Sequence, residues 1–160
     1  MQNPTIRQAK QDDLLQMLEL LRAKAEFDGG IELLKATADE INEAFFGERP
    51  RVSAIVAEIG DELVGFATFF ETFSTFLAKP CLWLDDLFVV PSHRSQGVGK
   101  LLLKELAHLA KYAGVARIDW NVAATNPRGQ AFYEQIGAKI RRGTLTVRLD
   151  AAAIADLVNG

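Results

Sequence analysis

The feature that most constrains the fold is a strand, a glycine-rich turn and an amphipathic helix in direct succession. Residues 82–90 form an apolar run that ends at Pro91, and residues 93–100 then read HRSQGVGK. The helix is predicted to begin at the glycines of this turn and to end at Gly114, and a strand over 116–122 follows. Because crossovers of this kind are right-handed and join parallel strands of one sheet, the two strands should lie side by side. The sequence therefore predicts an α/β fold with a mixed sheet.

Local patterns predict the other elements. Apolar runs indicate further strands at 5–9, 52–59, 63–73 and 139–149, and Gly60-Asp61 forms the turn between the middle two. Helices are predicted to begin at the N-capping residues Asp12, Thr37, Asn126 and Asp150, and the first three should end near Gly29, Gly47 and Gly137. No repeat or linker interrupts the 160 residues, so we expect a single domain over 1–160.

Composition narrows the class of partner. The formal net charge is −3, which lacks the basic excess expected of a nucleic-acid-binding protein. No apolar run approaches the roughly 20 residues of a membrane span, and the first residues lack the pattern of a secretory signal. Cys81 is the only cysteine, which favours a reducing, cytoplasmic setting. Small molecules are therefore the expected partners, rather than nucleic acid or membrane.

Glycines at the start of a helix typically bind a phosphate through backbone N–H groups. The nucleotide P-loop requires GxxxxGK followed by Ser or Thr, but here Lys100 is followed by Leu101. The dinucleotide fingerprint requires a small third residue where this chain has Leu102. The pattern that fits is Arg94-x-x-Gly97-x-Gly99. By itself this pattern also suits an ordinary glycine-capped helix start.

With this motif the chain resembles the Gcn5-related N-acetyltransferases, and within them the diamine and thialysine branch that includes spermidine/spermine N-acetyltransferase. Four blocks carry the resemblance in order: residues 73–80, residues 83–89, the glycine turn, and Asn126-Pro-x-x-x-x-Phe-Tyr-Glu-x-x-Gly-Ala138. The resemblance implies a twisted mixed sheet flanked by helices, with acetyl-CoA between splayed parallel central strands. It also implies a homodimer that transfers acetyl to an amine by direct attack.

The resemblance assigns roles to individual residues. The backbone of the strand before the turn should bind the pantetheine arm, at Leu87, Phe88 and Val89. The turn should bind the pyrophosphate, through Arg94, Ser95, Gln96, Gly97, Val98, Gly99 and Lys100. Asn126 should face the cofactor, and Tyr133 should act as the general acid that protonates the departing thiolate.

A primary amine has a pKa near ~10.4, so a carboxylate that accepts its proton, directly or through water, would help the reaction. Asp85 and Asp86 are the candidates, and strand alternation places them on opposite faces of the sheet. The family has its functional glutamate at the first position, so we assign the catalytic and acceptor-binding role to Asp85. The alternative, strand-end acids that form only turn or loop hydrogen bonds, stays open.

The acceptor side is predicted from the end of the first helix. Negative charge opposes the helix dipole there, yet Glu26 and Asp28 occupy it, and the segment resembles the family's acidic-aromatic patch for cationic acceptors. A solvated helix end is the alternative. Phe69, Phe70, Phe73 and Phe76 are expected in the core rather than at a pocket or dimer interface.

The leading hypothesis is transfer of acetyl from acetyl-CoA to a primary amine of a polyamine, diamine, lysine or lysine analogue. The alternatives are the same reaction on a protein or antibiotic amine, and a non-catalytic CoA-binding sensor. His93 and His108 have no cysteine or carboxylate at metal-binding spacing, so no metal is expected.

Overall fold

The computed structural model describes residues 3–160, which divide into a larger unit ending at Asn121 and a smaller unit, Val122–Gly160. The strands of the larger unit are β1 (Thr5–Gln8), β2 (Ser53–Ile59), β3 (Glu62–Ser74), β4 (Lys79–Val89) and β5 (Ile118–Asp119). Its α-helices are α1 (Leu14–Phe27), α2 (Ala38–Phe46) and α3 (Val98–Tyr112), with short 3-10 turns η1 (Gln11–Asp13), η2 (Ile31–Leu33) and η3 (Pro91–His93).

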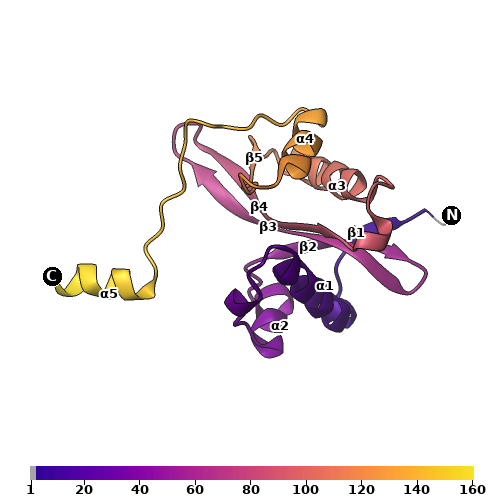
Figure 1. Cartoon of the computed structure of the whole chain (residues 1–160), viewed down its shortest axis with the longest axis horizontal. Helices are drawn as coiled ribbons and strands as arrows, with labels where there is room; N and C mark the ends of the chain where they lie inside the picture. Colours follow the sequence, from indigo (N-terminus) through magenta and orange to yellow (C-terminus); the bar gives the residue numbers. More distant parts are fainter. Residues whose placement is uncertain (1–2) are drawn as a thin grey trace. The chain divides into compact units, whose positions relative to one another are not determined.

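The strands form one mixed sheet in the order β1-β2-β3-β4-β5. The pairs from β1 to β4 are antiparallel, and β4 pairs with β5 in parallel after the α3 crossover (Figure 1). The predicted α/β mixed sheet is therefore confirmed. The predicted strand over 116–122 is much shorter than expected, because only Ile118 and Asp119 pair with β4.

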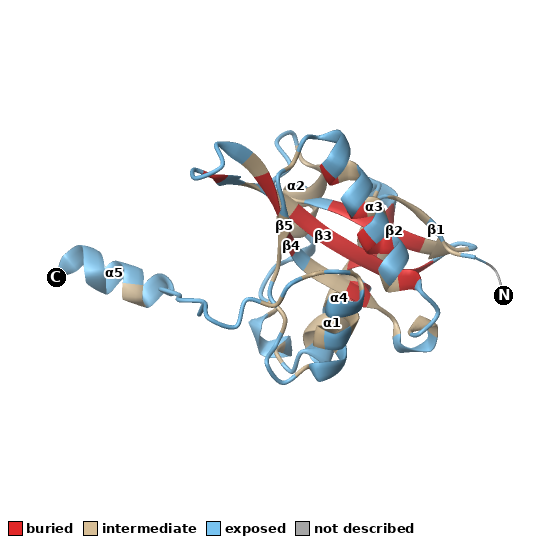
Figure 2. Cartoon of the chain, turned by 90° about the horizontal axis from the view of Figure 1, so that it is seen from above, coloured by how far each residue is buried: buried red, intermediate tan, exposed pale blue. Residues whose placement is uncertain are grey.

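Helices cover both faces of this sheet, α1 and α2 on one and α3 on the other (Figure 1). On the first face, Met17 and Leu20 of α1 pack with Val56, Phe66 and Phe88. On the other face, α3 buries its inner residues Val98, Leu102, Leu103, Leu106 and Ala110. Figure 2 shows the buried residues running along the central strands between these helices. Packing of helices on both faces of the sheet holds β4 and the start of α3 in place, and the predicted site lies there.

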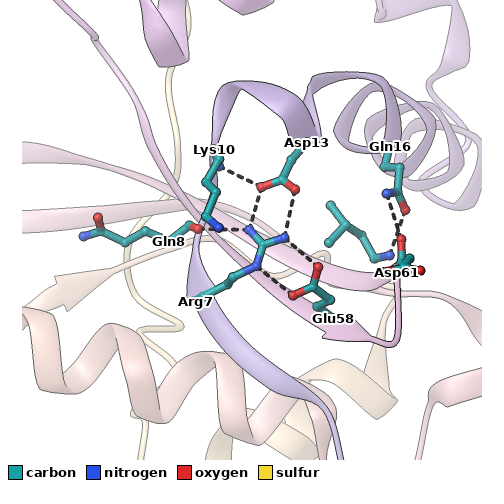
Figure 3. A network of polar contacts seen from close by, with 8 residues as sticks. Arg7, Gln8, Lys10, Asp13, Gln16, Glu58 and Asp61 are labelled. Atoms are coloured by element: carbon teal, nitrogen blue, oxygen red, sulfur yellow. Dashed lines mark hydrogen bonds and ion pairs between the residues drawn. The ribbon is translucent and has the colours of Figure 1, made fainter.

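The first helix is anchored by Asp13 rather than by the predicted Asp12. Asp13 is buried, and its carboxylate accepts hydrogen bonds from Nη1 and Nη2 of Arg7 at 2.7 and 2.9 Å and from the backbone N–H of Lys10 at 2.7 Å (Figure 3). Arg7 also binds Glu58 of β2 through Nε and Nη2, both at 2.8 Å. The network joins β1, β2 and the start of α1. The bonds from Arg7 are tertiary contacts, so a capping pattern in the local sequence could not show that Asp13 rather than Asp12 anchors the helix.

The hairpin of β3 and β4 carries the phenylalanines that were expected in the core. Phe69 is buried, but Phe73 and Phe76 are exposed, so the expectation is wrong for these two. Phe73 lies in the part of β3 beyond Phe69, the last residue that pairs with β2, and Phe76 lies in the turn after Ser74. Among residues 3–160, β4 is the one strand that pairs with that end of β3.

The smaller unit contains α4 (Pro127–Gln135) and α5 (Ala151–Asn159). Both begin as predicted: the Asn126 side chain accepts from Gly129 N–H at 2.9 Å, and the Asp150 side chain accepts from Ala153 N–H at 2.9 Å. The predicted strand over 139–149 is wrong, because these residues adopt no strand and Leu145, Val147 and Leu149 are exposed. Apolar alternation identifies a face, but a strand also requires a hydrogen-bonded partner, and among residues 3–160 none pairs with this segment.

Within residues 3–160 there is no helix whose length and apolar character would suffice to span a bilayer.

Candidate functional site

The backbone edge of β4 that faces β5 is largely unpaired. Of the residues described, only Leu82 and Trp83 of β4 have strand partners on β5. Residues 84–89 therefore continue to the glycine turn with an edge that has no strand partner in the sheet. Such an edge presents N–H and C=O groups to a ligand that carries amides, as the pantetheine arm of coenzyme A does. The backbone of Leu87, Phe88 and Val89 lies in this part of β4, where Val89 C=O already accepts from Arg94 Nε, and its contact with the pantetheine arm stays a prediction.

The glycine turn leads into a helix whose N-cap residue is a glycine. Gly97 is the N-cap of α3 with a φ of 84°, and Ser95 also has a positive φ of 63°. Gly97 has no side chain that could cap α3, and the first helical hydrogen bond runs from Leu101 N–H to Gly97 C=O. The N–H groups of the three residues between them, 98–100, precede the first possible helical bond. These N–H groups and the positive end of the helix dipole form a site suited to an anion.

The side chains of the turn differ in how far they are available to bind an anion. Val98 is buried in the core beneath α3, so only its backbone is available to a ligand. The Gln96 amide donates to Ser92 C=O at 3.0 Å, which closes the turn on itself, and Lys100 is exposed. Arg94 donates from Nε to Val89 C=O at 2.8 Å. The backbone of the turn, more than its side chains, is therefore arranged for anion binding, and the pyrophosphate contacts stay a prediction.

Asp85 lies in a β-bulge. The β3–β4 register passes from Thr68↔Asp86 directly to Phe69↔Leu84, which leaves Asp85 without a partner on β3. Strict alternation therefore fails at this position. The expectation that Asp85 and Asp86 face opposite sides of the sheet is wrong.

Both aspartates lie on the face that α1 covers. Asp86 is 3.3 Å from Lys24 Nζ of α1, and its Oδ2 accepts from the buried Thr68 hydroxyl at 2.7 Å. Asp85 is exposed, and its Oδ1 accepts from the indole N–H of Trp83 at 3.1 Å. Trp83 pairs with Phe70, two residues from Thr68 along β3, and so projects to the same face. The bulge thus brings two carboxylates to one side of β4.

The end of α1 adds further charge on this face. Lys24 Nζ binds Asp28 at 2.6 Å as well as Asp86. Burial would lower the pKa of Lys24, but the hydrogen bond with Asp28 and the charges of Asp86 and Asp28 outweigh it, so the pKa is raised and Lys24 stays protonated. Asp28, predicted for acceptor binding, is therefore already paired with a cation. Glu26 is exposed, and no ion pair of its carboxylate is recorded among residues 3–160.

Of the residues that contact Asp86, Lys24 and Thr68 were missed by sequence reasoning. The spacing of Lys24 and Asp28, four residues apart on one helix, is a signal that could have revealed their ion pair. The contact of Lys24 with Asp86 joins positions on different elements and has no local signal.

The remaining predicted residues belong to the smaller unit. Asn126 uses its carboxamide oxygen to cap α4. Tyr133 is half-buried on α4, with its ring 5.3 Å from that of Phe132. The cofactor contact of Asn126 and the proton transfer by Tyr133 stay predictions. Within residues 3–160, no three histidine, cysteine, aspartate or glutamate side chains gather as a metal-binding group.

Comparison with known proteins identifies the family. Residues 14–138 match the model of the acetyltransferase (GNAT) family, which covers α1 to α4 and includes the turn and both aspartates. The chain belongs to this family. This GNAT chain is 28% identical to thialysine N-epsilon-acetyltransferase of Mus musculus over 98% of both proteins. It is 37% identical to L-ornithine N5-acetyltransferase of Arabidopsis thaliana over 61% of this chain and 43% of that protein.

Among solved structures, an integron cassette protein from V. cholerae matches this GNAT chain over 100% of both chains, with a TM-score of 0.82 and 26% identity. The family membership and this neighbour confirm the fold that the sequence resemblance implied. They also confirm that the protein is an acetyltransferase of the GNAT type, a family that uses acetyl-CoA as the donor.

Proposed function

We propose that this chain transfers acetyl from acetyl-CoA to a primary amine of a small cationic acceptor, such as a polyamine, a diamine, lysine or a lysine analogue. The observation that carries the proposal is the glycine start of α3, with Gly97 in the left-handed region, shortly after the edge of β4 that lacks a strand partner among the described residues. The edge offers hydrogen bonds to the amides of the pantetheine arm, and the helix start offers N–H groups to the pyrophosphate. The names of the thialysine and ornithine acetyltransferases support an amine acceptor of this class.

The reaction requires one bond to form and one to break. The neutral amine attacks the thioester carbonyl carbon, the C–S bond breaks, the nitrogen loses a proton and the thiolate gains one. Asp85 is proposed to accept the amine proton through water, since its carboxylate is exposed and, among residues 3–160, accepts a side-chain hydrogen bond from the Trp83 indole alone. Tyr133 is proposed to donate the proton to the thiolate, because its phenol is a donor at neutral pH.

A cationic acceptor suits the charges on the α1 face. Asp85, Asp86, Asp28 and Glu26 are four carboxylates, against two cations, Lys24, which binds two of them, and Arg94, whose guanidinium lies over the Phe27 ring. The excess of negative charge attracts an ammonium group to the end of α1. Since Lys24 engages Asp28 and Asp86, Glu26 and Asp85 are the acids proposed to contact the acceptor.

The family match supports one further part of the proposal. Residues 14–138 continue across the division between the two units at Asn121 and Val122. We therefore propose that the units form a single acetyltransferase domain. A homodimer in the cytoplasm, which the resemblance implies, stays a prediction that sedimentation and fractionation would test.

The activity is tested by thiol release from acetyl-CoA over a panel of diamines, polyamines, amino acids, aminoglycosides and a lysine peptide. Release with the small cationic amines and little with the peptide or aminoglycosides is expected. Preference for the peptide or the aminoglycosides would overturn the acceptor class. Binding of acetyl-CoA with no release from any amine would indicate a sensor instead.

The cofactor loop is tested with a matched pair of glycines at the two ends of α3. Gly97 and Gly114 have φ values of 84° and 67°, and an added Cβ meets no atom within 4 Å at either position. Alanine in this left-handed region costs about 1–2 kcal/mol at both sites, so Gly97→Ala and Gly114→Ala should lose similar stability. Only Gly97→Ala should weaken CoA binding, by about tenfold or more, since a displaced N–H group loses a hydrogen bond to a charged ligand. Equal CoA affinity of the two variants in calorimetry would overturn the loop assignment.

A further inference from the structure

The side chain of Arg94 connects the start of the cofactor loop to the end of α1. Its guanidinium carbon lies 4.3 Å from the ring centroid of Phe27 and 5.3 Å from that of Phe88. The two rings are tilted by 59° with centroids 6.3 Å apart, and both make cation–π contacts with the guanidinium. The Nε group donates to Val89 C=O at 2.8 Å. Arg94 is therefore fixed to β4 on one side and to the last residue of α1 on the other.

Phe27 makes this cation–π contact without being part of the hydrophobic core. Its side chain is 58% exposed, whereas Phe88 is 5% exposed and packs with Met17 and Leu20. An exposed phenylalanine gains little hydrophobic stabilisation, and its recorded ring contacts are with Phe88 and Arg94. A role in holding Arg94 explains this placement better than a role in stabilising the fold.

The loop after Arg94 has positive φ angles, and a fixed residue at its start would help to hold this backbone conformation. Ser95, the next residue, has a φ of 63°, a conformation that non-glycine residues adopt at a cost, and Gly97 has a φ of 84°. Several backbone N–H groups must converge on one anion for the loop to bind pyrophosphate. Fixing the residue at the entrance lowers the entropy that cofactor binding would otherwise have to remove.

We propose that Phe27 is a positioning residue for the cofactor loop, acting through Arg94. The inference rests on the proposed function, in which the 94–100 loop binds the pyrophosphate. Phe27 lies between Glu26 and Asp28, the acids predicted for the acceptor, yet its substitution should affect the cofactor. This separates the proposal from a direct contact of Phe27 with the acceptor.

The test measures CoA affinity by calorimetry for Phe27→Leu, Phe27→Tyr, Arg94→Met and the double variant Phe27→Leu/Arg94→Met. A cation–π contact at a partly exposed site corresponds to a change of about two- to fivefold in affinity, so Phe27→Leu should weaken CoA binding by that factor. Phe27→Tyr keeps an aromatic ring and should restore the wild-type affinity. In the Arg94→Met background, Phe27→Leu should cause no further loss.

Phe73→Leu is the matched control, because Phe73 is 64% exposed and is not among the rings recorded within reach of Arg94. It should leave CoA affinity unchanged. In steady-state kinetics, Phe27→Leu should raise the KM for acetyl-CoA and leave kcat close to that of the wild type.

Three results would overturn the inference. They are wild-type CoA affinity in Phe27→Leu, independent effects of the two substitutions in the double variant, or a raised KM for the amine alone. If Gly97→Ala still loses affinity in the same experiment, the proposed function stands and only the inference fails. If the wild-type protein binds no CoA, both are overturned.

Discussion

Replacing Asp13 with asparagine should destabilise the protein far more than the same change at its neighbour Asp12. Asp13 is 6% exposed and accepts three hydrogen bonds, two from Arg7 and one from the backbone of Lys10. Asparagine keeps the shape but removes the charge, and its amide N–H groups face donors. Asp12 is exposed, and no side-chain hydrogen bond or ion pair is recorded for it among residues 3–160, so Asp12→Asn is a matched control.

The magnitude follows from these contacts. Hydrogen bonds to charged groups contribute about 1.5–3 kcal/mol each, and breaking a fully buried ion pair costs about 3–5 kcal/mol. The loss here is smaller, because the Arg7 side chain is 20% exposed and keeps its bonds to Glu58. We expect about 2–3 kcal/mol for Asp13→Asn, which lowers Tm by about 5–10 °C for a chain of this length. Asp12→Asn should change the stability by less than about 0.5 kcal/mol.

The dependence on pH gives a second signature. The hydrogen bonds from Arg7 hold the pKa of Asp13 below its ordinary value of 3.8, despite burial, which would raise it. A carboxyl with a lowered pKa contributes stability that is complete above the unfolded-state pKa and is lost as pH falls through the folded-state pKa. The difference between wild type and Asp13→Asn should therefore be largest near neutral pH and shrink below about pH 4.

Urea unfolding from pH 7 down to pH 3 measures both effects. If Asp12→Asn proves as destabilising as Asp13→Asn, the capping position predicted from sequence is the correct one and the network is incidental. A difference between wild type and Asp13→Asn that persists unchanged to pH 3 would refute the electrostatic explanation.

Two further predictions concern the chemistry. Tyr133→Phe should keep its CoA affinity and lose about 10²-fold or more in turnover, and a variant with full turnover would show that solvent protonates the thiolate. Asp85→Asn should bind acetyl-CoA normally and lose most rate near neutral pH, with partial recovery as rising pH supplies neutral amine. A pH–rate comparison with wild type tests this, with Asp61→Asn in the β2–β3 turn as control; identical profiles for Asp85→Asn and wild type would remove Asp85 from the site.

The sequence predicted those features that depend on local contacts. Thr37 caps α2 through its hydrogen bonds with Glu40, three residues away, and Asn126 caps α4 through Gly129. The glycine turn and its helix were predictable for the same reason, since Gly97 provides the left-handed conformation at the helix start. In each case the interacting groups lie within four residues, so the pattern contains both partners.

Features that depend on distant partners were not predictable in this way. Asp13 differs from Asp12 in its local hydrogen bond from Lys10 N–H and in its bonds from Arg7, which is in turn held by Glu58, a residue 51 positions from Arg7. The bulge at Asp85 is a property of the pairing between β3 and β4 and leaves no mark on β4 alone. Residues 139–149 have the apolar alternation of a strand, but nothing in one segment reveals whether a partner strand exists.

The bulge also changes the reason for choosing Asp85 over Asp86 as the proposed base. Alternation no longer separates them, since both lie on the α1 face, but their partners do. Asp86 is paired with the ammonium of Lys24 and hydrogen-bonded to Thr68, so protonating it would weaken an ion pair in a half-buried setting. Asp85 accepts a hydrogen bond from a neutral indole and is exposed to water, so it can take up a proton and release it to solvent without breaking an ion pair. On this argument Lys24 and Thr68 hold Asp86 as a fixed charge, and Asp85 is the carboxylate left available for proton transfer.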